Sequence, residues 1–64
     1  MNVEDRAIVL ASQDSFDNWV VTSGGNKAKA ASDILKDIVS DDSQDDDIKM
    51  TLASKVVGFY WGMV

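Results

Sequence analysis

Two polar interruptions divide this chain and constrain its fold more than any other feature of the sequence. The first, residues 22–26, contains Gly24 and Gly25 between residues that commonly cap helices. The second, residues 40–47, contains no apolar side chain, and the chain shows no internal repeat. We therefore expect a single small helical domain over residues 1–64. Its segments are residues 2–22, 26–40 and 44–63.

The middle segment has the clearest helical pattern, and it predicts a helix over residues 27–39. Asn26 follows a glycine directly and is a residue type that caps helix N-termini. The charged side chains fall on the side of the helix opposite the apolar ones. The apolar face consists of residues at the i, i+3, i+4 and i+7 positions: Ala31, Ile34, Leu35 and Ile38.

The C-terminal segment predicts a helix from about residue 45 to residue 62, capped by Ser43. The helix would have two apolar stripes, and no charged side chain follows Lys55. A helix that is apolar on two sides must bury both sides. One stripe is formed by Ile48, Leu52, Val56, Phe59 and Met63, and the other by Met50, Val57, Trp61 and Val64.

The N-terminal segment is ambiguous, because its apolar residues fall on two different helical faces. Asn2 can cap a first helix, and a break within residues 13–15 would allow two short helices, the second capped by Asp14 or Ser15. The alternative is a hairpin that pairs residues 7–11 with residues 19–22, which are good strand formers. Helices are favoured, since an isolated two-stranded hairpin is only marginally stable.

Size and composition exclude several classes of protein. The chain has 64 residues, a formal net charge of -5 and no Cys, His or Pro, so disulfides and thiolate or imidazole metal sites are impossible. An acidic chain is poorly suited to bind nucleic acid directly. Residues 1–6 are acidic and no stretch is apolar enough for a membrane span, so we expect a cytoplasmic protein without membrane contact. The fold expected is an all-α bundle of three or four short helices, completed by oligomerisation.

The aspartates of residues 41–47 are the most conspicuous polar cluster. Neither possible register supplies the alternating ligands, central glycine and closing glutamate of a calcium loop, so we expect no metal site. A solvated loop that leads into a helix N-terminus is the simpler interpretation, and a weak partner-binding surface is the alternative. The residues concerned are Asp41, Asp42, Asp45, Asp46 and Asp47.

Catalysis and cofactor binding have little support in the sequence. Lys27 follows the paired glycines, but Ala28 stands where a phosphate-binding loop requires Ser or Thr, so residues 24–27 predict a plain turn. Without His or Cys, and with little chain to build a closed pocket, we expect no enzyme, no catalytic residue and no cofactor.

The C-terminal run of Phe, Tyr, Trp and Met is typical of interfaces, and three consecutive aromatic side chains on a helix cannot all point inward. We expect a small acidic protein that acts through protein–protein contacts and forms a homo-oligomer through its C-terminal helix. The alternative is an inhibitor or nucleic-acid-mimicking decoy that binds a basic protein surface through its aspartate cluster. The residues expected in self-association are Val57, Gly58, Trp61, Gly62 and Val64.

Overall fold

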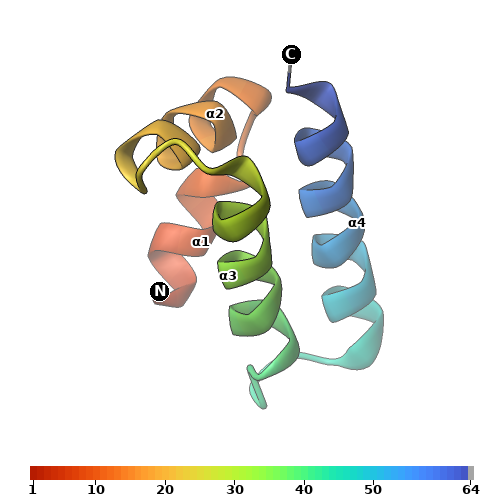
Figure 1. The fold of residues 1–64 in the computed structure, drawn as a ribbon. Helices are drawn as coiled ribbons and strands as arrows, with labels where there is room; N and C mark the ends of the chain where they lie inside the picture. The colour runs from red at the N-terminus through yellow and green to blue at the C-terminus, as the bar shows by residue number, and fades with distance from the viewer. Residues whose placement is uncertain (64) are drawn as a thin grey trace.

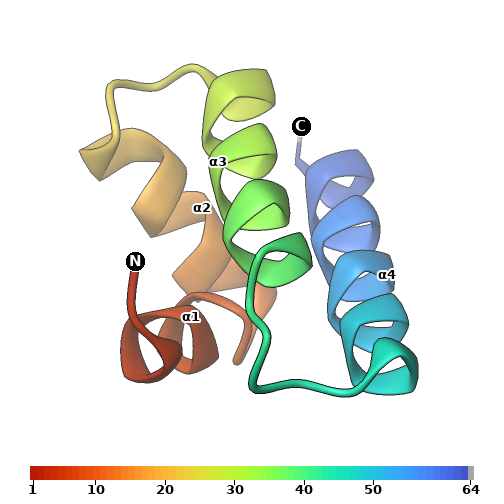
Figure 2. The same ribbon diagram turned by 90° about the horizontal axis from the view of Figure 1, so that it is seen from below.

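The computed structural model describes residues 1–63, which form four helices and no strand. α3 and α4 run antiparallel side by side, α2 packs against both, and α1 packs against α2 (Figures 1 and 2). The predicted all-α fold is confirmed, and the alternative of an N-terminal hairpin is wrong. The helices are α1 (Val3–Val9), α2 (Gln13–Thr22), α3 (Lys27–Val39) and α4 (Asp46–Gly62).

The first three helices begin at residues whose side chains accept a hydrogen bond from a free backbone N–H. Asn2 caps α1, because its Oδ1 accepts a hydrogen bond from the backbone nitrogen of Asp5 at 2.8 Å. Asn26 caps α3 in the same way at 3.1 Å, as predicted. The break between α1 and α2 comes earlier than predicted, because Ser12, rather than Asp14 or Ser15, is in extended conformation and caps α2.

The start of α4 also differs from the prediction. Asp45 occupies the N-cap position without a side-chain hydrogen bond to the helix. Ser43, the predicted cap, instead bonds to Asp41, whose Oδ1 accepts from the Ser43 backbone nitrogen at 2.9 Å and from its hydroxyl at 2.5 Å. These two hydrogen bonds to Asp41 form a tight turn in the loop before α4 begins. Asp46 and Asp47, in the first turn, complement the positive end of the helix dipole.

The turn between α2 and α3 depends on its paired glycines. Gly24 has φ of 106° and Gly25 has φ of 83°, a region that residues with a Cβ rarely adopt. This conformation lets the chain reverse within a few residues and enter α3 at Asn26. The predicted turn between two helices, followed by the Asn26 cap, is confirmed.

The core lies where α2, α3 and α4 meet. Phe16 of α2 is fully buried, and its ring centroid is 5.7 Å from that of Phe59 and 6.1 Å from that of Trp19. The predicted inner face of α3 is buried, except that Leu35 is only half-buried and Ala30 is buried as well. The buried apolar residues are Val9, Leu10, Phe16, Val20, Ala30, Ala31, Ile34, Ile38 and Val56.

Candidate functional site

The outer face of α4 exposes large apolar side chains. Trp61 is 76% exposed and Val57 is 47% exposed, and Met50 lies exposed on the same side of the helix two turns earlier. The other predicted stripe faces the core, where Val56 is buried and Leu52, Phe59 and Met63 are partly buried, although Ile48 remains exposed. Val64, which was predicted for the outer stripe, lies outside the described residues.

A shallow groove of about 280 Å³ lies between α3 and α4 beside this face. Tyr60 and Trp61 form its aromatic end, with ring centroids 5.4 Å apart in an edge-to-face arrangement. The ammonium nitrogen of Lys27 lies 4.9 Å from the centroid of the Tyr60 ring, which places a cation over one of the two aromatic rings. The groove is lined by Ala28, Ala31, Ser32, Leu35, Val56, Val57, Tyr60 and Trp61.

The two glycines of α4 have different surroundings. Beyond its chain neighbours and the backbone of α4 itself, a Cβ built at Gly58 would meet no atom within 4 Å, so this position is open to another molecule. A Cβ at Gly62 would press on the side chain of Gln13. The Gln13 amide nitrogen donates to the Phe59 carbonyl at 2.9 Å and to Asp17 at 2.8 Å, which ties the start of α2 to the end of α4. The close approach at Gly62 is thus one made within the chain.

The aspartate cluster is divided between two roles. The carboxylate of Asp41 accepts a hydrogen bond from Arg6 at 2.6 Å as well as those from Ser43, so it is engaged in the fold. The others are exposed, and the described residues place no basic side chain within ion-pair distance of them. These free carboxylates belong to Asp42, Asp45, Asp46 and Asp47.

Arg6 is the charged residue whose position the sequence did not reveal. It is only 3% exposed, and its guanidinium donates to Asp37 at 3.0 Å and to Asp41 at 2.6 Å. The hydrogen bond from the Ser43 hydroxyl, followed by that from Arg6 and that from the Ser43 backbone, lowers the pKa of Asp41 from 3.8 to about 2. One buried arginine therefore joins α1, α3 and the loop before α4.

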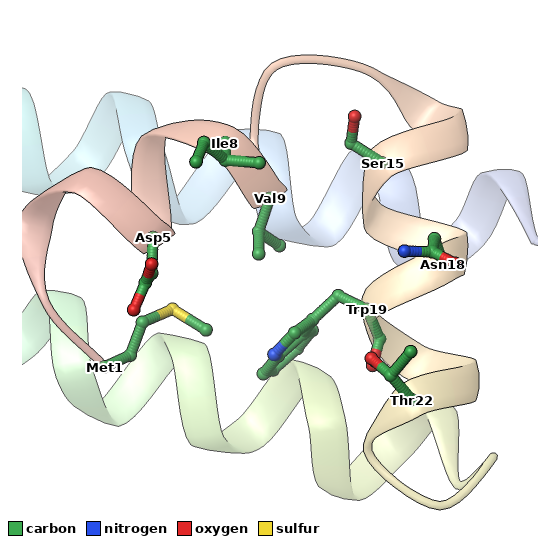
Figure 3. A pocket seen from close by; sticks show the side chains of 8 residues that line it. All are labelled: Met1, Asp5, Ile8, Val9, Ser15, Asn18, Trp19 and Thr22. Carbon is green, nitrogen blue, oxygen red and sulfur yellow. The ribbon is translucent and has the colours of Figure 1, made fainter.

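A larger pocket of about 410 Å³ lies between α1 and α2 (Figure 3). Trp19 projects from α2 across this pocket, and Met1 and Asp5 lie on the opposite wall (Figure 3). The sequence did not predict the pocket, because its shape depends on how α1 crosses α2. Its lining combines apolar and polar side chains: Met1, Asp5, Ile8, Val9, Ser15, Asn18, Trp19 and Thr22.

Residues 1–63 contain no group of three or more acidic side chains placed to hold a metal ion. Among the same residues, no helix is both long enough and apolar enough to span a membrane. In comparisons with protein families, with curated proteins and with solved structures, this chain matches none of them.

Proposed function

We propose that this chain is a non-enzymatic acidic protein that acts through protein–protein contacts and self-associates through the outer face of α4. The observation that carries the proposal is the exposure of Trp61 and Val57 beside an apolar groove, on a helix with no charged side chain after Lys55. Monomeric proteins seldom leave a large continuous apolar surface in water. Tryptophan in particular is enriched among the residues that dominate binding energy.

The energetics favour association for a chain of this size. A core of fewer than about 70 residues rarely supplies more than about 3–5 kcal/mol without disulfides or a metal. Burying one large apolar side chain is worth about 2–3 kcal/mol, which is a large fraction of that total. A typical interface takes about 800 Å² from each partner, and the whole chain exposes 4191 Å². An interface of ordinary size would therefore cover roughly a fifth of the surface.

Sedimentation over a range of concentrations tests the proposal. We expect the unmodified protein to form species larger than 7.0 kDa at micromolar concentration, with a Tm that rises with concentration. Trp61→Asp should give a 7.0 kDa monomer whose Tm no longer depends on concentration. Val21→Asp is the matched control, because Val21 is 70% exposed on α2 and lines neither hollow. A single 7.0 kDa species for the unmodified protein would refute the proposal.

A second function is favoured by the four exposed aspartates at the start of α4. They place negative charge, unpaired within residues 1–63, at one end of the molecule, where it could contact a basic surface on another protein. Such an inhibitor or decoy would bind with an affinity that falls steeply with salt. Changing Asp42, Asp45, Asp46 and Asp47 together to Asn tests this function, and Asp41 is left unchanged because it holds Arg6. Unaltered capture of the protein's cellular partners by this variant would count against the decoy role.

A further inference from the structure

The pocket between α1 and α2 lies between two helices that carry mostly acidic side chains. α1 and α2 together carry four acidic side chains and a single basic one, Arg6, which is buried and paired with Asp37 and Asp41. Asp5 lines the pocket and is exposed, and the apolar side chain of Ile8, 65% exposed, lies on the same wall. The pocket therefore offers apolar side chains next to a carboxylate that forms no ion pair with a basic side chain of residues 1–63.

α3 and α4 carry slightly more basic than acidic side chains, five lysines against four aspartates. All five lysines of the chain lie on these two helices. Lys27 is the one next to the exposed aromatic group, since its ammonium lies over the ring of Tyr60, which packs edge-to-face on Trp61. This surface therefore presents a projecting indole, and the ring of Tyr60 against which it packs carries the cation of Lys27. The pocket and the groove share no lining residue, so both surfaces are available on one copy at the same time.

We propose that the protein assembles head to tail, with Trp61 of one copy seated in the α1–α2 pocket of the next copy and Lys27 placed beside Asp5. This inference rests on the proposed self-association and specifies which surface Trp61 binds. This contact matches apolar and charged groups at the same time. The Trp61 indole of one copy packs against Trp19 and Ile8 of the next, and the Lys27 ammonium lies beside the Asp5 carboxylate. At about 410 Å³ the pocket falls in the size range of sites that hold small ligands, which is sufficient for one aromatic side chain.

The polar lining of the pocket meets the remaining requirement of a buried tryptophan. An indole N–H that leaves water needs a hydrogen-bond acceptor. The α2 wall of the pocket carries three side-chain oxygens that can accept, and Figure 3 shows them on the same helix as Trp19. The acceptors are those of Ser15, Asn18 and Thr22.

A head-to-tail contact uses two different surfaces, so each copy can bind two neighbours. Such a contact produces either a closed ring or an open chain, whereas a symmetric contact stops at a dimer. We therefore expect the unmodified protein to grow beyond a dimer as its concentration rises.

Mixing two variants tests the inference directly. Trp61→Ala removes the projecting indole and leaves the pocket intact. Ile8→Lys blocks the pocket and leaves the indole intact, and a cation near the C-terminus of α1, four residues after Glu4, suits the helix. We expect each variant alone to sediment at 7.0 kDa, with self-association weakened about tenfold or more. An equimolar mixture should form a one-to-one pair, because one intact contact remains.

The controls separate failure of this inference from failure of the proposed function. Val21→Lys makes the same chemical change at an exposed α2 position outside the pocket, and should assemble like the unmodified protein. Asn18→Lys, which alters the other wall of the pocket, should behave like Ile8→Lys. Assembly of Ile8→Lys at unmodified strength, with no pairing in the mixture, would overturn the head-to-tail contact while leaving a symmetric one. Assembly of Trp61→Ala at unmodified strength would overturn both the contact and the proposed function.

Discussion

Arg6 is the side chain on which the position of α1 most depends. Its guanidinium is buried and donates to two carboxylates, 31 and 35 residues further along the chain. Removing one partner of such a group leaves the others desolvated and unpaired, which costs more than the interaction itself contributes. We expect Arg6→Ala to lower the free energy of unfolding by about 2–3 kcal/mol, measured by urea denaturation at neutral pH.

A matched pair of variants checks that the hydrogen bonds, and not charge alone, produce this effect. Arg6→Lys keeps the positive charge but cannot reach Asp37 and Asp41 with two separate nitrogens. It should be intermediate in stability. Equal stability of Arg6→Lys and the unmodified protein would show that a point charge is sufficient at this position.

Asp41 gives the fold a specific dependence on pH. Its pKa is lowered from 3.8 to about 2 in the folded chain, so the folded state favours the ionised carboxylate. The stabilisation is therefore fully present above about pH 4 and is lost as the pH falls toward 2. We expect the free energy of unfolding to decrease over that interval, and Asp41→Asn to make the decrease smaller. Asp42→Asn, at the exposed neighbour, serves as the control in urea titrations at each pH, and a decrease identical in both variants would contradict the prediction.

At the scale of the helices, the glycines of α4 allow a direct comparison. Glycine in a helix interior costs roughly 0.5–1 kcal/mol relative to alanine. Space is free around Gly58, so Gly58→Ala should raise stability by about that amount. Gly62→Ala should bring no such gain, because Gly62 is the last residue of α4 and its Cβ would displace the Gln13 side chain that bonds to Phe59.

Both glycine variants are best measured by thermal unfolding in a Trp61→Ala background, so that self-association does not contribute to the Tm. If Gly62→Ala stabilised the chain as much as Gly58→Ala, the contact between the start of α2 and the end of α4 would be energetically unimportant.

The boundaries of the helices show what the sequence could predict and what it could not. α3 was predicted with its correct bounds, because periodicity, an Asn cap and a preceding glycine turn all agree there. The break before α2 was placed too late, since Ser12, Asp14 and Ser15 are all capping residues and only tertiary packing selects among them. The cap of α4 was wrong because Ser43 bonds to Asp41 instead.

Surface features, like helix boundaries, were predictable where they follow from a local pattern and not where they depend on tertiary packing. Exposure of Val57 and Trp61 was predictable from helical periodicity alone, once the inner stripe was assigned to the core. Burial of Arg6 was not predictable, because charged residues are usually exposed and its partners are distant in sequence. The pocket between α1 and α2 depends on the crossing of two helices, which no local pattern specifies.

At the scale of the whole molecule, topology and composition predict simple folding kinetics. Four helices joined by short connections make mostly local contacts, and such proteins fold in microseconds to milliseconds. The chain also has no proline, so the slow cis–trans isomerisation of X–Pro bonds, which takes tens of seconds, cannot occur. We expect Trp61→Ala to refold in one rapid phase in stopped-flow or temperature-jump experiments.

The unmodified protein should add a slower phase whose rate increases with protein concentration, because its copies must meet before they associate. A slow phase that is independent of concentration, or one that persists in Trp61→Ala, would contradict this account of folding followed by association.

The different surroundings of the two tryptophans also have an optical consequence. Trp19 is half-buried beside Phe16, whereas Trp61 projects into water. The two indoles therefore differ in emission wavelength and in accessibility to a dissolved quencher. Trp19→Phe leaves one indole whose emission should shift toward shorter wavelength when copies assemble. Trp61→Phe leaves one indole whose emission should change when the chain unfolds. Emission from Trp61 therefore reports contact with neighbours, whereas emission from Trp19 in Trp61→Phe, which lacks the projecting indole, reports the integrity of the fold.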